Sequence, residues 1–160
     1  MTIRQGTIEE MLSLWYKFYT TEFFVENLQT GNAEFWVIEK QGRLVAELYF
    51  FKCLSDHDFA DGSTTAYLYG FYVTENMRGK GLGTTLLKAV LQRLSELGFR
   101  YATIGVEPCE KANVRLYERM GFTEKMKTSH INLCDVDEDS RPAQYPEYWL
   151  LRKMLQTVNC

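Results

Sequence analysis

The amino-acid sequence predicts a mixed α/β fold of the α+β kind, in which helices flank a central sheet. Residues 66–73 (AYLYGFYV) and 101–107 (YATIGVE) are rich in aromatic and β-branched residues, as strands are. Between these two runs, apolar residues recur at helical spacing from Leu86 to Leu97, so a helix crosses from one strand to the next. The length of 160 residues, of which 46% are hydrophobic, predicts one globular domain over residues 1–160.

The N-terminal part predicts a helix followed by a hairpin. Residues 7 to about 28 carry apolar side chains at helical spacing, and Thr7 with Glu10 suits a capping box at the helix start. Within residues 34–51, two β-rich runs flank Gln41-Gly42, a favourable two-residue hairpin turn. These elements add two antiparallel strands to the predicted sheet.

The C-terminal part predicts a helix and further strands. Gly98 stands where a glycine ends the crossover helix. Residues 111–120 predict a short helix that Gly121 ends, and a strand follows it. We expect a polar, acidic loop at residues 135–144 and a last strand at residues 148–155.

Charge and cysteine content argue against several protein classes. A net charge of −3 lacks the clustered positive charge of a nucleic-acid surface. No apolar run approaches the ~20 residues of a membrane span, and the first residues do not have the layout of a signal peptide. Cys53, Cys109, Cys134 and Cys160 show no paired spacing, so we expect free thiols rather than disulfides or a zinc site. We therefore expect a cytoplasmic protein that binds no metal, nucleic acid or membrane.

A glycine-rich loop, residues 78–84 (RGKGLGT), lies between the strand at residues 66–73 and the crossover helix. Its three glycines let the backbone turn tightly and come close to a ligand. The helix start offers unpaired N–H groups to an anion, and Arg78 and Lys80 add positive charge. This chemistry suits a pyrophosphate, although a strand-to-helix turn without a ligand would use the same glycines.

The glycine spacing distinguishes between nucleotide ligands. The run G-x-x-x-x-G-K-[ST] of a P-loop is absent from the sequence. The dinucleotide pattern G-x-G-x-x-G also fails, because Thr84 or Leu86 stands where its third glycine belongs. The pattern that fits is R-x-x-G-x-G at Arg78, Gly81 and Gly83. Binding of ATP or NAD is therefore disfavoured.

The strand, the loop and the following helix resemble the coenzyme-A-binding core of the GNAT superfamily of N-acetyltransferases. Residues 116–122 (LYERMGF) resemble the L-Y-E-x-x-G-F signature that follows the fifth strand in that superfamily. The resemblance covers about residues 66–124, and the hairpin within residues 34–51 suits the family's earlier strands. It implies a central mixed, mostly antiparallel sheet flanked by helices, with two strands that splay apart at an acetyl-CoA site. It also implies acetyl-CoA as the cosubstrate and no metal.

The resemblance assigns the cofactor contacts to two neighbouring segments. Phe71, Tyr72 and Val73 are expected to offer backbone groups to the pantetheine arm, which lies along their strand like an added strand. The Val73 N–H is the expected hydrogen-bond donor to the acetyl carbonyl. The residues expected to hold the pyrophosphate are Arg78, Gly79, Lys80, Gly81, Gly83 and Thr84.

The signature helix adds a catalytic candidate. Tyr117 matches the tyrosine that in many family members protonates the departing thiolate. The alternative is a tyrosine that only packs the helix onto the sheet. Asn113 lies one helical turn before Tyr117 and is a second candidate contact to coenzyme A. Many family members instead carry asparagine where this chain has Glu110, so the contact is open between Asn113 and Glu110.

The attacking amine must lose a proton, and three residues are candidates for the base. They are Glu47 in the second hairpin strand, Tyr69 in the pantetheine strand and Glu107 after the next strand. Each is equally compatible with an ordinary strand residue that faces solvent. Some family members rely on water instead.

Three further patterns favour simpler interpretations. His57 lies among aspartates, but without a second histidine or paired cysteines we expect a solvated loop rather than a metal site. The acidic run that begins at Asp135 could attract a cationic amine, but we expect it to be solvated surface. Cys109 follows a strand near the expected thioester, and a small packing thiol is favoured over an acyl-carrying nucleophile.

The function predicted from these features is direct transfer of an acetyl group from acetyl-CoA to a primary amine of a small molecule, within a ternary complex. Two alternatives stay open: acetylation of a protein or peptide amine, and a non-catalytic module that binds acyl-CoA for regulation. The expected partner is thus a small-molecule amine or a peptide amine, and the chain is expected to be a monomer or a homodimer.

Overall fold

Over residues 1–156, the part of the chain that the computed structural model describes, seven strands form one sheet. The spatial order is β1-β2-β3-β4-β5-β7-β6, and the pairing is antiparallel except between β4 and β5. The bounds are β1 Thr2–Gln5, β2 Ala33–Lys40, β3 Arg43–Phe51, β4 Thr65–Val73, β5 Tyr101–Val106, β6 Glu124–Val136 and β7 Pro142–Met154. The predicted mixed, mostly antiparallel sheet is confirmed.

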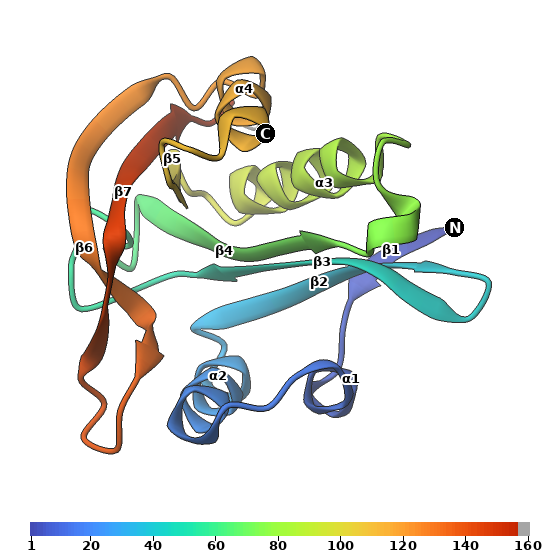
Figure 1. Ribbon diagram of the computed structural model, residues 1–160, viewed down its shortest axis with the longest axis horizontal. Coiled ribbons are helices and arrows are strands. Elements are labelled where there is room, and N and C mark those ends of the chain that lie inside the picture. Colours follow the sequence, from blue (N-terminus) through green and yellow to red (C-terminus); the bar gives the residue numbers. More distant parts are fainter. Residues whose placement is uncertain (157–160) are drawn as a thin grey trace.

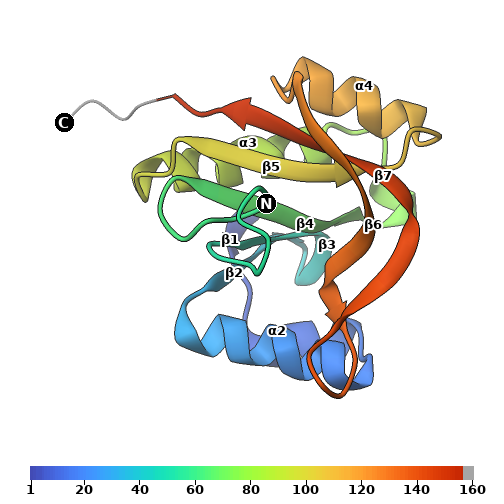
Figure 2. The same ribbon diagram turned by 90° about the vertical axis from the view of Figure 1, so that its left-hand side faces the viewer.

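Helices cover both faces of this sheet, as Figure 1 shows. α1 (Ile8–Leu14) and α2 (Phe18–Thr30) lie on one face, and α3 (Leu82–Glu96) and α4 (Lys111–Arg119) lie on the other. Each face has its own apolar core, and α3 supplies its core with Leu86, Leu87, Val90, Leu91 and Leu94, whereas Leu97 lies after the helix and is exposed. β6 and β7 curve from the side of α4 round to α2 (Figure 2). No helix within residues 1–156 is long and apolar enough to span a membrane.

Several predicted turns are confirmed by backbone geometry. Gln41 and Gly42 have φ angles of 52° and 73°, which a two-residue hairpin turn of this kind requires. Gly98 and Gly121, with φ of 92° and 98°, end α3 and α4 in the left-handed region. The Thr7 capping box is present, because the Thr7 hydroxyl accepts from the Glu10 N–H while the Glu10 carboxylate accepts from the Thr7 N–H.

The N-terminal helix differs from its prediction: one helix from residue 7 to about 28 is wrong. α1 ends at Leu14, the next residue Trp15 has extended φ and ψ, and α2 begins after Lys17. At the break, the Trp15 indole N–H donates to the hydroxyl of Tyr49 in β3 at 3.0 Å. The apolar spacing continues over the break, so periodicity alone could not locate it.

The two ends of the sheet also differ from prediction. β1 was not predicted, since four residues are too few to show a strand pattern. Only the middle of the loop predicted at residues 135–144 is a loop, because β6 continues to Val136 and β7 already starts at Pro142. The hairpin turn itself is short and is closed by Asp137, whose carboxylate accepts from the Asp139 and Arg141 N–H groups at 2.9 Å.

β4 and β5 separate at the middle of the sheet. Their parallel pairing runs from Thr65 opposite Tyr101 to Leu68 opposite Ile104 and then stops. The splayed strands implied by the family resemblance are therefore present. At the point of separation β4 has a bulge, because Glu47 faces Tyr72 whereas Tyr49 already faces Tyr69.

Gly70 lies in this bulge and adopts a φ of +71°, which an L side chain rarely adopts. The extra residue changes which face the following side chains occupy. Tyr69 packs against Phe24 of α2, with ring centroids 5.9 Å apart, whereas Phe71 and Val73 pack into the core beneath α3. The bulge therefore directs the end of β4 toward the loop that precedes α3.

Candidate active site

A groove of about 790 Å³ lies between the end of β4, the glycine loop, the start of α3 and the adjoining face of α4. Nearly all predicted cofactor contacts meet in its lining: Phe71, Tyr72, Val73, Arg78, Gly79, Gly81, Gly83, Thr84 and Asn113. Two predicted cofactor contacts lie outside this lining: Lys80, whose ammonium lies 3.9 Å from the Met77 sulfur, and Tyr117, which lines the adjoining cavity. Segments that are separate in the sequence thus form one elongated site.

The glycine loop leaves the start of α3 open. Gly79 and Gly81 have φ of 77° and 79°, so both use the left-handed region. A Cβ built on Gly81 would meet no described atom within 4 Å, and Gly81 as N-cap has no side chain of residues 1–156 bonded over it. The free N–H groups of the first turn therefore face unfilled space. This is the arrangement that binds phosphate at helix N-termini.

Gly83 lets α3 pack closely on β4. A Cβ at this position would lie 2.9 Å from Phe71 Cζ and 3.4 Å from Val73 Cγ2. Arg78 connects the same loop to the strand: its Nε donates to the Val73 carbonyl at 2.9 Å, and its guanidinium carbon lies 5.3 Å from the centroid of the Tyr72 ring. The loop and the strand end are thus held together as one wall of the groove.

The β4 backbone offers hydrogen-bonding groups on its open side. The Thr74 N–H donates to the Val45 carbonyl at 2.9 Å, and Ala46 is the register partner of Val73. In an antiparallel ladder this makes Ala46 and Val73 a non-hydrogen-bonded pair. The Val73 N–H and carbonyl therefore point away from β3, toward the gap left by β5. The carbonyl is the one that accepts from Arg78.

A cavity of about 310 Å³ lies at the splay itself, lined by both strand ends and by Tyr117 of α4. Tyr117 is buried, and this burial raises the pKa of its phenol, so the hydroxyl keeps its proton at neutral pH. Asn113 and Glu110 also line the cavity, and the Asn113 amide donates to the Glu110 carboxylate at 2.8 Å. The two alternative cofactor contacts are therefore bonded to each other.

A second pocket, of about 200 Å³, lies on the opposite face of β4, beneath α1 and α2. Glu47 lines it, and Glu47 Oε2 is buried without a hydrogen-bond partner in residues 1–156. Burial raises the pKa of Glu47 to about 7. Tyr69 and Gly70 line both this pocket and the cavity at the splay, so the two spaces adjoin at the bulge.

The three candidate bases differ in their surroundings. The Tyr69 hydroxyl accepts from the Asn132 amide at 2.9 Å, and burial raises its pKa, which makes it a poor proton acceptor at neutral pH. Glu107 lines the cavity at the splay and lies near the exposed Cys109, whose sulfur is 3.7 Å from its carboxylate. The geometry and the raised pKa favour Glu47 as the base.

The acidic run is exposed at Asp137, Glu138 and Asp139, as expected, but at Asp135 the expectation of solvated surface is wrong. The Asp135 side chain is buried and accepts from Lys17 Nζ at 2.5 Å, Thr20 Oγ1 at 2.7 Å and the Tyr145 hydroxyl at 3.0 Å. Burial opposes ionisation, but these hydrogen bonds lower the pKa of Asp135 below its ordinary value. Asp135 thus joins β6 to α2 at the edge of the second pocket.

The loop around His57 and the cysteines show no sign of a metal site within residues 1–156. Near His57, the carboxylates of Asp56 and Asp58 pair with Lys127 at 2.5 Å and 3.1 Å, and Asp61 accepts backbone N–H groups of its own turn. Residues 1–156 contain no group of three or more potential metal ligands. Cys53, Cys109 and Cys134 are free thiols, and Cys160 lies outside the described residues.

Sequence reasoning missed several residues of the second pocket. Trp15, Phe24 and Tyr145 line it together with Glu47 and Asp135. They come from the α1–α2 connection, α2 and β7, and no local motif marks any of them. The break after α1, which would have pointed to Trp15, is not visible in the apolar spacing.

Comparisons with known proteins agree with this geometry. A sequence model described as "Acetyltransferase (GNAT) family" matches residues 4–122. The L-methionine sulfoximine/L-methionine sulfone acetyltransferase of Pseudomonas paraeruginosa is 35% identical over 54 residues, which are 34% of this chain and 31% of that protein. The spermine/spermidine N(1)-acetyltransferase of Bacillus subtilis is 35% identical over 69 residues, or 42% of this chain and 45% of that protein. The chain thus covers less than half the length of these relatives.

Solved structures share the fold over almost the whole chain. A ribosomal-protein-alanine N-acetyltransferase from Brucella melitensis has a TM-score of 0.71 at 19% identity, covering 97% of this chain and 100% of that one. A GNAT family acetyltransferase from Elizabethkingia anophelis with acetyl-CoA bound has a TM-score of 0.65 at 17% identity, covering 96% of this chain and 97% of that one. The fold prediction is confirmed by both.

Proposed function

Because the chain belongs to the GNAT family of acetyltransferases, we propose that it transfers the acetyl group of acetyl-CoA to the primary amine of a small molecule. The observation that carries the proposal is a row of three adjoining spaces, because the cavity at the splay shares Phe71 and Asn113 with the groove and also adjoins the pocket that holds Glu47. A long groove suited to a phosphorylated cosubstrate lies on the α3 side, and a pocket with an unpartnered carboxylate lies on the α1–α2 side. Tyr69 and Gly70 belong to the walls of both the pocket and the cavity at the splay.

The chain's residues fit acetyl-CoA in three ways. The open first turn of α3 would hold the pyrophosphate, the unpaired side of β4 beyond Leu68 would offer backbone groups to the pantetheine arm, and the splay would admit the thioester. When bound, acetyl-CoA supplies an acetyl carbon that an amine can attack and a sulfur that leaves as a thiolate. Arg78 occupies the Val73 carbonyl, whereas the Val73 N–H, which points away from β3, is available to the ligand.

Three groups of the chain then share the chemistry. The Glu47 carboxylate takes a proton from the acceptor ammonium, so that the neutral amine attacks and forms the C–N bond. The Val73 N–H donates to the acetyl oxygen as negative charge develops there. Tyr117 donates its phenol proton to the sulfur as the C–S bond breaks. Direct transfer in a ternary complex needs no acyl-cysteine, and Cys109 lies outside the lining of both spaces.

The relatives' names point to different acceptors, among them an amino-acid derivative, polyamines and a ribosomal protein. The pocket of about 200 Å³ supports a small molecule, because a peptide substrate requires an extended binding surface. Acetylation of a peptide amine remains the alternative outcome of the test.

The test measures thiol release from acetyl-CoA with a panel of small amines, amino acids, polyamines and short peptides. Tyr117→Phe is expected to lower kcat by roughly 10²- to 10⁴-fold, the range for loss of a general acid. Binding of acetyl-CoA, measured by calorimetry, should be unchanged. Tyr19→Phe, at an exposed position of α2, is the matched control and should keep the wild-type rate.

Two results would contradict the proposal in different ways. Acetyl-CoA binding without thiol release from any acceptor would favour the non-catalytic acyl-CoA-binding module. A normal rate in Tyr117→Phe, with acceptor-dependent release intact, would remove Tyr117 from the mechanism but leave the reaction in place.

A further inference from the structure

The acceptor pocket, the space of about 200 Å³ beneath α1 and α2, has aromatic walls. Trp15 lies edge-on to Phe24 with ring centroids 4.9 Å apart, and Phe24 in turn lies edge-on to Tyr49 at 5.1 Å. Tyr69 completes the set, with its centroid 5.9 Å from Phe24. These rings come from the α1–α2 connection, α2, β3 and β4, so the fold itself holds them together. A bound ring would find edges and faces to pack against.

The pocket has one carboxylate that lacks a cationic partner. Asp135 is satisfied by Lys17, Thr20 and Tyr145, and the pairing neutralises the Lys17 charge as well. Glu47 Oε2, by contrast, is buried with no bonding partner in the described part of the chain. The lining therefore has room for one ammonium, against Glu47. A second ammonium would find no free carboxylate. A carboxylate on the ligand would face the Glu47 carboxylate, and the nearby Lys17 ammonium is already paired with Asp135.

The size of the pocket limits the ligand further. A protein cavity of roughly 150 Å³ accepts a benzene molecule. The acceptor pocket, at about 200 Å³, is larger by about the volume of a short aminoalkyl chain. A linear polyamine would leave the aromatic walls largely unfilled and would extend beyond the pocket.

From these observations we infer that the acceptor is an aromatic monoamine, a primary amine carried on a short alkyl chain by a single aromatic ring. Its ammonium lies against Glu47 and its ring against Trp15, Phe24 and Tyr69. The inference rests on the proposed acetyl transfer, because the pocket adjoins the splay where the amine must attack. It goes beyond that proposal by excluding amino acids and polyamines as preferred acceptors.

The test compares 2-phenylethylamine with two probes that each change one property. Phenylalanine adds a carboxylate to the same skeleton, and spermidine replaces the ring by further amines. We expect kcat/KM for 2-phenylethylamine to exceed that for either probe by at least tenfold. Calorimetry at pH 8 should show 2-phenylethylamine binding to the protein, and Glu47→Gln should weaken this binding at least tenfold.

A second variant tests the aromatic wall. Trp15→Leu should raise the KM for 2-phenylethylamine at least tenfold while acetyl-CoA binding stays unchanged. Tyr16→Leu, at the neighbouring position, is the control, because Tyr16 is 68% exposed and lies outside the pocket lining. An unchanged KM in Trp15→Leu, in protein that still binds acetyl-CoA, would overturn the placement of the ring.

The remaining outcomes separate the two proposals. Faster turnover of spermidine or phenylalanine would overturn the acceptor class and leave acetyl transfer standing. Glu47-dependent binding of 2-phenylethylamine without turnover would support the acceptor class and contradict acetyl transfer to it. Absence of both binding and turnover for 2-phenylethylamine would overturn the inference, and absence of turnover for every amine would overturn the proposed function too.

Discussion

At the scale of single residues, Glu47 combines a buried oxygen that lacks a partner in residues 1–156 with a pKa raised to about 7 by burial. A base of this pKa gains its carboxylate form as pH rises through neutrality. We therefore expect kcat/KM to increase with pH and to level off above about 7. Glu47→Gln should flatten this profile and lower the rate by roughly 10²- to 10⁴-fold.

Glu47→Gln, which should lower the rate, should raise the stability of the protein above neutral pH. Between the ordinary pKa of 4.5 and the folded value of about 7, folded Glu47 holds a proton that the unfolded chain has lost. Stability therefore falls as pH rises through this window. Glu47→Gln escapes this loss, so its melting temperature relative to wild type should be higher at pH 8 than at pH 4. Glu26→Gln, on the exposed side of α2, should show neither effect. A Glu47→Gln enzyme with the wild-type pH profile would assign the proton to Glu107 or to water.

At the scale of elements, the start of α3 can be tested against the end of α2. Gly81 precedes α3 with a φ of 79°, and Gly31 follows α2 with a φ of 80°. A Cβ on either glycine would meet no described atom within 4 Å. Alanine at either position should therefore lower the free energy of unfolding by a similar amount, about 1–2 kcal/mol, because its backbone must stay in the left-handed region.

The two alanine variants should differ in ligand binding. Gly81→Ala places a methyl group where the pyrophosphate is proposed to lie, so the Kd for acetyl-CoA should rise at least about tenfold, a free-energy change of about 1.4 kcal/mol. Gly31→Ala should leave it unchanged. Calorimetry of both variants, together with their melting temperatures, checks this. Equal affinities would place the pyrophosphate elsewhere.

Elements with a local physical cause could be predicted from the sequence. The capping box at Thr7, the turn at Gln41-Gly42 and the glycines after α3 and α4 depend on neighbours within a few residues, and all are as predicted. The bulge at Gly70 and the break at Trp15 were not predicted. Both depend on tertiary partners, since Tyr49 of β3 lies beside Gly70 and bonds Trp15.

The candidate site divides in the same way. The cofactor groove is formed largely by one continuous stretch, from Phe71 to Thr84, so a motif could reveal it. The acceptor pocket takes its lining from the α1–α2 connection, α2, β3, β4, β6 and β7. No spacing within the sequence connects Trp15 with Asp135, and only the folded chain brings them together.

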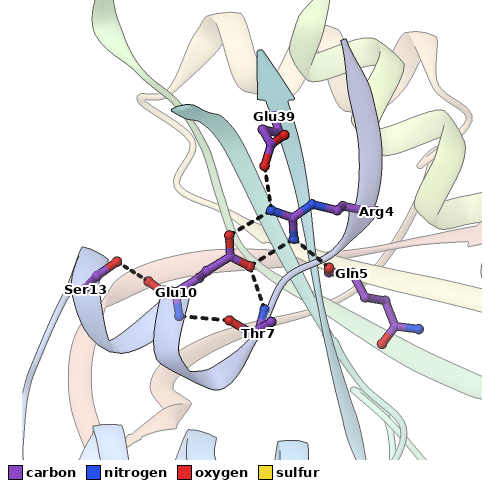
Figure 3. A network of polar contacts seen from close by, with 6 residues as sticks. All are labelled: Arg4, Gln5, Thr7, Glu10, Ser13 and Glu39. Atoms are coloured by element: carbon purple, nitrogen blue, oxygen red, sulfur yellow. Dashed lines mark hydrogen bonds and ion pairs between the residues drawn. The ribbon is translucent and has the colours of Figure 1, made fainter. Parts of the chain in front are cut away.

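At the scale of the whole molecule, an ion-pair network connects the edge of the sheet to the first helix. Arg4 of β1 pairs with Glu10 of α1 and with Glu39 of β2, each at 2.8 Å (Figure 3). Hydrogen bonding from Arg4, and then from Thr7, lowers the pKa of Glu10 to about 2. The network thus holds α1 to β1 and β2 at the edge of the sheet.

The lowered pKa of Glu10 gives this network a pH dependence. Its contribution to stability is complete above the ordinary pKa of 4.5 and is lost as pH falls toward 2. Arg4→Met should destabilise the protein at pH 7 by about 1 kcal/mol, a modest value because solvent screens partly exposed pairs. Denaturant unfolding of wild type and variant should give converging stabilities near pH 2. A constant difference across this range would show that Arg4 acts through packing rather than charge.

The separation of β4 and β5 divides the sheet into an N-terminal half, β1 to β4, and a C-terminal half, β5 to β7, joined by the pairs from Thr65–Tyr101 to Leu68–Ile104. Beyond Leu68, the Val73 amide that points into the gap should exchange rapidly with solvent deuterium. Saturating acetyl-CoA should slow this exchange and raise the free energy of unfolding by about 2.7 kcal/mol at 100 times Kd. Hydrogen exchange with and without ligand measures both; an amide equally protected in both states would contradict it. Acetyl-CoA would then act as a removable strand, and the two halves of the sheet would be bridged beyond Leu68 only while acetyl-CoA is bound.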